Sequence, residues 1–226
     1  MPIRSCDLSV YLVTDTRLCG EFGVAATVAA AVAAGVTLVQ LRDPEIDDDG
    51  FVAIGRAMAA VLSGTGVPLI VNDRVDLVTA IGADGVHVGQ GDLRPDVARR
   101  MIGPTALLGL SVQTVEQVRA AEELGAGVID YLGVGPVWPQ VTKPDAADPS
   151  GLSRLESIVD VSPWPCVAIG GVDADRAALV RRTGAAGVAV VSAICGRPDV
   201  AAATSRIRSS WDSAVDVPGR RQAESR

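Results

Sequence analysis

The most regular feature of the sequence is a short apolar run that follows an alanine-rich segment and a glycine. This arrangement recurs as "AAGVTLVQLR" at 33–42, "IGADGVHVGQ" at 81–90, "LGAGVIDYLGVG" at 124–135 and "TGAAGVAVVSA" at 183–193. The glycine suits the left-handed cap that ends a helix. A run of Val, Ile and Leu with little alternation is typical of a strand buried on both faces. The pattern therefore predicts βα units on a parallel sheet.

The apolar runs predict about eight strands in an α/β fold. They lie near 8–14, 36–41, 67–71, 85–89, 106–111, 128–134, 165–170 and 187–191. Helices are expected at 23–34, 48–63, 114–124 and 173–183, with Thr114 and Asp173 as N-caps of the last two.

Eight βα units favour a single (β/α)8 TIM barrel over residues 1–214. A doubly wound sheet is the rival fold. It is expected to carry GxGxxG after its first strand, and "YLVTDTRLCG" lacks that motif. Residues 215–226 show no apolar periodicity, so a disordered C-terminal tail is expected there.

Composition and charge narrow the classes of function. The chain of 226 residues has a net charge of −7 and no basic stripe, so no nucleic-acid partner is expected. No apolar run approaches the roughly 18 residues of a membrane span, and "MPIRSCD" has no apolar signal core. A cytoplasmic protein without a membrane partner is therefore expected. Four scattered cysteines and one histidine argue against zinc. Association into a homo-oligomer is left open.

Polar residues or glycines follow nearly every predicted strand. In chain order they are Gln40, Arg42, Asp43, Asn72, Asp73, Asp92, Ser111, Thr142, Lys143, Gly170, Gly171 and Ser192. In a (β/α)8 barrel the carboxyl ends of the strands, with their loops, build the active site. The pattern therefore predicts one polar site at one rim of the barrel.

Two carboxylates, Asp73 and Asp92, follow neighbouring predicted strands. Such a pair repels unless a cation lies between, and carboxylates with water and substrate phosphate form the usual Mg²⁺ environment. The alternative is that each carboxylate caps the helix that follows it. Arg42 and Lys143 at the same rim favour a Mg²⁺ site that serves a phosphorylated substrate.

Two further features of the rim indicate phosphate binding. Lys143 is the only lysine beside nineteen arginines, which suggests a position that needs a compact ammonium group. "AIGGV" and "VVSA" follow the last two strands, where TIM barrels commonly bind phosphate, although tight turns would also explain the glycines. His87 is interpreted as a satisfied core histidine. Without a nucleophile and base pair, the set suits a departing pyrophosphate and attack by a second phosphorylated molecule.

Several motifs in one order carry a resemblance to a known family. "YLVTD", "VTLVQLR", "PLIVNDRVDL", "GADGVHVGQGDL", "LGLSV", "YLGVGPV", "TKPDA", "VAIGGV" and "GVAVVSAI" resemble the thiamine phosphate synthases over about residues 10–195. The resemblance implies that 4-amino-2-methyl-5-hydroxymethylpyrimidine pyrophosphate and 4-methyl-5-(2-hydroxyethyl)thiazole phosphate are joined to thiamine phosphate, with release of pyrophosphate. It also implies Mg²⁺ and a dissociative mechanism, in which pyrophosphate leaves first and the thiazole nitrogen attacks a ring-stabilised methylene cation.

The resemblance also implies roles for single residues. Asp73 and Asp92 look like the Mg²⁺ ligands, and Arg42, Lys143 and Ser111 look like the catalytic groups. Positions for the pyrimidine pyrophosphate are Gln40, Arg42, Asn72, Ser111 and Lys143, and positions for the thiazole phosphate are Thr142, Gly171, Val191 and Ser192. The predicted substrate-binding set is completed by Leu41, Asp43, Pro44, Gln140 and Val141.

Two positions depart from the family pattern. Pro44 stands where Gln-Leu-Arg-x-Lys has lysine, so one pyrophosphate cation is missing, and Gln140 stands where Thr-x-Thr-Lys has its first threonine. Two rivals remain. A related thiazole tautomerase shares the barrel but has a catalytic histidine where Pro136 stands. A non-catalytic regulatory barrel that binds thiazole phosphate would not need Asp73, Asp92 and Lys143 together.

Overall fold

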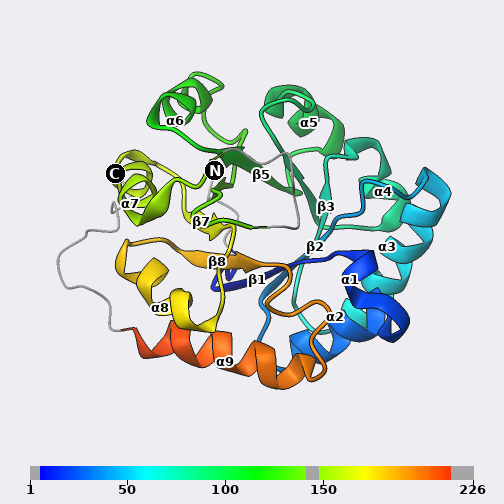
Figure 1. Cartoon of the computed structure of the whole chain (residues 1–226). Coiled ribbons are helices and arrows are strands. Elements are labelled where there is room, and N and C mark those ends of the chain that lie inside the picture. Colours follow the sequence, from blue (N-terminus) through cyan, green and yellow to red (C-terminus); the bar gives the residue numbers. More distant parts are fainter. Residues whose placement is uncertain (1–5, 141–147, 215–226) are drawn as a thin grey trace.

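A closed barrel of eight parallel strands forms the centre of the molecule, as the computed structural model in Figure 1 shows. The structure describes residues 6–140 and 148–214. The strands are β1 (Val10–Val13), β2 (Leu38–Leu41), β3 (Leu69–Asn72), β4 (Gly85–Val88), β5 (Leu107–Val112), β6 (Tyr131–Val134), β7 (Cys166–Ile169) and β8 (Gly187–Val190). They pair in chain order, and β8 closes on β1. The predicted (β/α)8 barrel is confirmed, and the doubly wound rival is wrong.

Helices alternate with the strands and surround the barrel (Figure 1). They are α1 (Thr16–Cys19), α2 (Val24–Ala33), α3 (Asp48–Leu62), α4 (Val78–Ile81), α5 (Pro95–Ile102), α6 (Val115–Glu122), α7 (Gly151–Val161), α8 (Ala174–Arg182) and α9 (Val200–Ser213), with 3-10 turns η1 (Gly20–Phe22) and η2 (Val75–Leu77). Thr114 accepts a bond from the Gln117 N–H, and Asp173 accepts one from the Arg176 N–H. Both predicted N-caps are confirmed.

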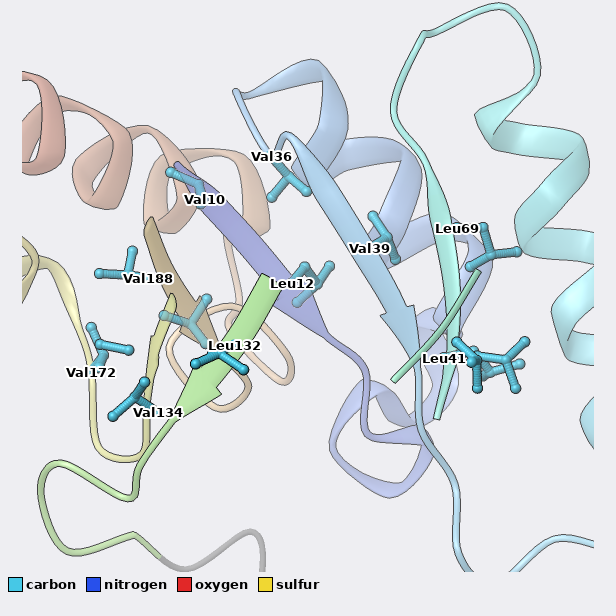
Figure 2. Packing of buried hydrophobic residues seen from close by; sticks show 14 of the residues in the cluster. Val10, Leu12, Val36, Val39, Leu41, Leu69, Leu132, Val134, Val172 and Val188 are labelled. Atoms are coloured by element: carbon cyan, nitrogen blue, oxygen red, sulfur yellow. The ribbon is translucent and has the colours of Figure 1, made fainter. Parts of the chain in front are cut away.

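Each strand is buried on both of its faces. In β1, Val10 and Leu12 belong to the cluster between the barrel and the helices, whereas Tyr11 and Val13 belong to a smaller cluster inside the barrel. Figure 2 shows the outer layer, in which side chains of several strands pack together. Because successive side chains of a strand point to opposite faces, two apolar layers require the nearly continuous apolar runs of the sequence.

An ion pair ties two strands together at the amino end of the barrel. Arg99 of α5 lies 2.6 Å from Asp130, the residue before β6, and both side chains are largely buried. The same carboxylate accepts the N–H of Leu108 in β5, and Arg99 also donates to the Ala106 carbonyl. Removal of one partner of a buried pair costs about 3–5 kcal/mol. This end of the barrel therefore serves stability, and the cavity lies at the opposite end.

Three of the sequence-based predictions concern residues outside the described ranges. They are the tail at 215–226, the Thr142 and Lys143 positions, and Val141. Within the described ranges, no single helix is both long and apolar enough to cross a membrane. The helical segments Thr16–Phe22 and Val24–Ala33 reach that length and apolar character only when taken together, and an 86° bend separates them.

Candidate active site

A cavity of about 350 Å³ lies at the carboxyl ends of the strands. It is lined by residues that end or follow most of the strands, so the barrel brings together side chains that are far apart in the sequence. The predicted site residues that line it are Gln40, Arg42, Asn72, Ser111, Gln140, Gly171, Val191 and Ser192. The rim location expected for a (β/α)8 barrel is thus where the cavity lies.

Three predicted substrate-binding residues do not line this cavity. Leu41 is fully buried in the outer apolar cluster. The Asp43 carboxylate turns back onto its own loop and accepts the N–H groups of Glu45 and Ile46. Pro44 is exposed in the same loop. Their contact with substrate stays a prediction.

Arg42 follows β2 and lines the cavity as a half-buried cation. Its backbone N–H donates to the buried Thr14 hydroxyl at 3.1 Å, which fixes the start of the loop. In the part of the chain that the structure describes, its guanidinium has no hydrogen bond or ion pair. Arg74 differs, because it pairs with Asp48 at 3.0 Å and lies over the Phe51 ring. Arg42 is therefore a cation available to a bidentate phosphate or pyrophosphate ligand.

Asp73 follows β3 in a backbone conformation that is unusual for a carboxylate residue. Its φ is 59°, and among the described residues no other non-glycine residue has a positive φ. Its N–H donates to the His87 carbonyl of the neighbouring β4 at 2.9 Å, and Asn72 donates to its carboxylate at 2.6 Å. Left-handed non-glycine residues are costly and cluster at functional sites. The geometry holds this exposed carboxylate at the rim.

Asp92 follows β4 and is also exposed. Its carboxylate accepts the Gly89 N–H at 2.7 Å, which closes a short turn. Helix α5 begins after Arg94 without a side-chain cap. The alternative that Asp92 caps this helix is therefore wrong.

The two aspartates fit a Mg²⁺ site that is completed by substrate and water. Among the described residues, no group of three or more His, Cys, Asp and Glu side chains could hold a metal. Asp73 and Asp92 follow adjacent strands and offer hard oxygen donors at the rim, although neither lines the cavity itself. Mg²⁺ is commonly held by one or two carboxylates, several waters and substrate phosphates. Arg42, Asp73 and Asp92 together are called the charged side of the rim.

In the closed order of the strands, β7 and β8 lie opposite β3 and β4. The loops after β7 and β8 present backbone groups. In the described residues, the N–H groups of Gly171 and Ser192 donate to no protein acceptor. Both residues line the cavity, so their N–H groups are available to an anion. These two residues are called the amide side of the rim.

Gly171 is also required by the packing of its loop. Its φ is +65°, and a Cβ there would lie 2.6 Å from the Pro139 carbonyl oxygen and 2.7 Å from the Trp138 Cβ. Trp138 donates its N–H to the Gly170 carbonyl at 3.0 Å, and Arg176 donates to the Gly171 carbonyl. The tight-turn explanation and the anion-cradle explanation for these glycines are therefore compatible.

The floor of the cavity holds a histidine whose ligand-facing position the sequence reasoning missed. His87 is 8% exposed and lines the cavity. It contacts the Tyr131 hydroxyl through Nδ1 at 3.1 Å and the Ser111 hydroxyl through Nε2 at 2.9 Å. The prediction of a buried, satisfied histidine is confirmed. A Cβ at Gly109 would lie 2.3 Å from the His87 ring, so this glycine in the middle of β5 was an available signal.

Comparison with known proteins identifies the family. The family model described as thiamine monophosphate synthase matches residues 10–194. The chain belongs to this family. A thiamine-phosphate synthase of Azorhizobium caulinodans is 46% identical over 203 residues, covering 90% of this chain and 94% of the relative. One of Roseiflexus sp. is 44% identical over 220 residues, covering 97% and 92%.

A solved structure agrees with the sequence matches. The thiamine phosphate pyrophosphorylase from Pyrococcus furiosus superposes with a TM-score of 0.81 at 34% identity, covering 92% of this chain and 98% of that chain. The predicted resemblance to the thiamine phosphate synthases is confirmed, and with it the enzyme class, a transferase of thiamine biosynthesis. The non-catalytic regulatory barrel is thereby disfavoured.

Three positions at which this chain differs from the family pattern or from the tautomerase rival can now be located in the structure. Pro136, where the tautomerase rival has histidine, lines the cavity without a titratable group. Gln140, which replaces a threonine of the family pattern, also lines the cavity, so its amide can reach a ligand there. Pro44, which replaces a lysine, is exposed and outside the cavity lining.

Proposed function

We propose that this enzyme joins 4-amino-2-methyl-5-hydroxymethylpyrimidine pyrophosphate to 4-methyl-5-(2-hydroxyethyl)thiazole phosphate, and so forms thiamine phosphate and pyrophosphate. The observation that carries the proposal is one cavity lined both by the uncommitted guanidinium of Arg42 and by the available N–H groups of Gly171 and Ser192. The exposed carboxylates of Asp73 and Asp92 follow β3 and β4 at the same rim, outside the cavity lining. Two differently charged phosphate groups, one of them with Mg²⁺, match these two sides.

Arg42 would hold the pyrophosphate of the pyrimidine substrate, together with Asn72 and the Lys143 position. Asp73 and Asp92 would hold Mg²⁺, which supplies positive charge to the departing pyrophosphate when it is bound. Gly171 and Ser192 would hold the thiazole phosphate through backbone N–H groups. Small-molecule substrates in the cytoplasm, without a nucleic-acid or membrane partner, are part of the same proposal, and a homo-oligomer remains compatible with it.

The reaction needs little acid–base chemistry from the chain. The C–O bond between the pyrimidine methylene and the pyrophosphate breaks, and its electron pair leaves with the pyrophosphate. The lone pair of the thiazole nitrogen then forms the C–N bond, and no proton has to be removed from this nitrogen. Charged groups that stabilise the leaving group are therefore the main catalytic requirement. Arg42 meets this requirement, and a general base at the cavity is not needed.

Pyrophosphate release from the two substrates tests the proposal. We expect release from the wild type only when both substrates and Mg²⁺ are present, and none in EDTA. Asp92→Ala should lower the rate by about 100-fold or more, because the leaving group loses metal stabilisation worth several kcal/mol. Asp76→Ala is the matched control, since Asp76 is an exposed carboxylate in η2 outside the cavity.

Other outcomes would lead to different conclusions. Release from the pyrimidine pyrophosphate alone would indicate a hydrolase. A folded protein that binds the thiazole phosphate but releases no pyrophosphate would indicate a binding barrel. Equal rates in Asp92→Ala and Asp76→Ala would remove Asp92 from the metal site.

A further inference from the structure

Five side chains beneath the cavity form a continuous chain of polar contacts. They come from β1, β2, β4, β5 and β6, and all of them are buried or half-buried. The contacts run from Gln40 Nε2 to Tyr11 Oη at 2.5 Å, to Tyr131 Oη at 2.9 Å, to His87 Nδ1 at 3.1 Å, and from His87 Nε2 to Ser111 Oγ at 2.9 Å. Both ends, Gln40 and Ser111, line the cavity.

The direction of these hydrogen bonds follows from a count of hydrogens, starting at Gln40. An amide nitrogen can only donate, so the Tyr11 hydroxyl accepts from Gln40. The single hydrogen of Tyr11 then has one protein acceptor among the described residues, the Tyr131 oxygen. Tyr131 must in turn donate its own hydrogen to His87 Nδ1. Burial raises the pKa of both tyrosines, so each keeps its hydrogen.

The count also determines what the far end presents to the cavity. If Nδ1 of His87 accepts, a neutral imidazole carries its proton on Nε2 and donates it to Ser111. The Ser111 oxygen is then occupied as an acceptor. Its own hydrogen has no protein acceptor among the described residues, and Ser111 lines the cavity. The hydroxyl therefore faces a ligand as a donor.

We propose that these five residues are a one-way hydrogen-bond relay, in which the orientation of the Gln40 amide sets the tautomer of His87 and makes Ser111 a donor to the ligand. Tyr11, Tyr131 and His87 are positioning residues in this relay. When Gln40 directs its nitrogen to Tyr11, its oxygen is left as an acceptor. The two ends thus offer an acceptor at Gln40 and a donor at Ser111. An aminopyrimidine, which has an amino donor and ring-nitrogen acceptors, matches this pair, and this last step alone rests on the proposed function.

The relay predicts that a change at one end reverses the other. Gln40→Glu replaces the donor by a carboxylate that only accepts, so Tyr11 must donate to it. Tyr131 then donates to Tyr11, His87 Nδ1 donates to Tyr131, and the proton moves from Nε2 to Nδ1. Ser111 would donate to the bare Nε2 and lose its donor role toward the ligand. The effect is transmitted across four hydrogen bonds.

The single histidine of the chain makes this tautomer directly measurable. Two-bond ¹H–¹⁵N correlation of ¹⁵N-labelled protein distinguishes the protonated ring nitrogen from the bare one without assignment of other residues. At about pH 9.5, some three units above the ordinary imidazole pKa, both the neutral ring and an ionised carboxylate are favoured. We expect Nε2–H in the wild type and Nδ1–H in Gln40→Glu, a change of about tenfold or more in the tautomer ratio.

Control variants separate the relay from other causes. Gln113→Glu adds the same charge to the cavity lining outside the relay, and Nε2–H should persist. Ser111→Ala should also keep Nε2–H, because the direction is set from Gln40. Gln40→Glu combined with Tyr131→Phe breaks the relay, so the switch to Nδ1–H should disappear.

Several results would overturn the relay. These are Nδ1–H or imidazolium in the wild type, the wild-type tautomer in a folded Gln40→Glu protein, and a switch in Gln113→Glu. The wild-type spectrum alone tests the direction if Gln40→Glu does not fold. None of these measurements uses substrate, so the relay and the proposed function can fail separately.

Discussion

On the charged side of the rim, Arg42 and the two aspartates present side-chain charges, whereas on the amide side Gly171 and Ser192 present backbone N–H groups. The charged side can be changed atom by atom, because a substitution removes the charge and leaves the backbone in place. The amide side cannot, because only proline lacks the backbone N–H, and proline also fixes φ near −65° and so changes the backbone itself. Other substitutions alter this side through the conformation that the glycine permits.

The two sides therefore predict opposite couplings of activity to stability. Loss of a charge should lower catalysis and leave the fold unaffected. Loss of the glycine should lower stability and phosphate binding together, because the same backbone serves packing and recognition. Substitutions on each side, with matched controls elsewhere, test this difference.

The largest effect is expected at Arg42. Arg42→Met keeps the length of the side chain but removes the uncommitted guanidinium, and we expect kcat/KM for the pyrimidine pyrophosphate to fall about 10²–10³-fold. The affinity for thiazole phosphate and the urea midpoint should stay unchanged. Steady-state kinetics of pyrophosphate release, calorimetric titration with thiazole phosphate and urea unfolding measure the three quantities.

Arg56→Met is the control for Arg42→Met, because Arg56 donates to the Ala80 carbonyl on the outer surface. It removes a cation of the same type away from the cavity and should leave kcat/KM unaltered. A similar loss of activity in both variants would show that net charge, rather than the position of Arg42, determines the rate.

The next effect is expected at Gly171. Gly171→Ala forces a left-handed alanine, which costs about 1–2 kcal/mol, and its Cβ would meet the Pro139 carbonyl oxygen at 2.6 Å. Overpacking of this kind adds about 1–3 kcal/mol. Urea unfolding should show that the free energy of unfolding falls by the sum of these two costs. The Kd for thiazole phosphate should rise in the same variant.

Gly64→Ala isolates the conformational part of this effect. Gly64 has a φ of +76°, and a Cβ there would meet nothing within 4 Å. The free energy of unfolding of this variant should fall only by the cost of a left-handed alanine, about 1–2 kcal/mol, and its affinity for thiazole phosphate should be unchanged. If the two alanine variants were equally stable, the contact of the new Cβ at position 171 with Pro139 would have no measurable cost in stability.

The barrel was predictable because its requirements are local and repeated. Every strand is buried on both faces, so each appears as an apolar run that needs no knowledge of its partners. The caps at Thr114 and Asp173 are equally local, since each side chain accepts the N–H of the residue three positions ahead. The polar residues after the strands could be found for the same reason.

The polar relay could not be predicted, because it depends on register between strands. His87 pairs in register with Gly109, and Gly109 with Tyr131, so the small residue leaves room for the histidine and the tyrosine to meet across it. Strand register is set by closure of the whole barrel, and no local pattern determines it. The sequence placed His87 in the core but could not give its partners.

A smaller effect is expected at Ser192. Ser192→Ala removes the hydroxyl but keeps the backbone N–H that the amide side uses. The lost hydrogen bond is worth about 0.5–1.5 kcal/mol, so the Kd for thiazole phosphate should rise by about 2–10-fold. Calorimetric titration measures this Kd. A loss as large as that of Gly171→Ala would mean that the hydroxyl, and not the N–H groups, holds the phosphate.

The smallest effect is expected at Asp43, in the loop that carries Arg42. Burial opposes ionisation of Asp43, yet the nearby Thr16 hydroxyl, the N–H groups of Glu45 and Ile46 and the charge of Arg74 hold its pKa below the ordinary value. A depressed folded-state pKa stabilises the fold above the ordinary pKa of about 3.9, and this stabilisation is lost as the pH falls through the folded-state value.

Asp43→Asn tests this account, because the amide oxygen can still accept both N–H groups while the charge is lost. Solvent screening limits the charge effect to a few tenths of a kcal/mol, about the size of an exposed ion pair. The wild type should therefore be slightly more stable in urea at pH 7, and the difference should close as the pH falls through the depressed folded-state pKa of Asp43. A difference that persists at low pH would originate in the altered loop geometry, and the charge of Asp43 would then play no part in positioning the Arg42 loop.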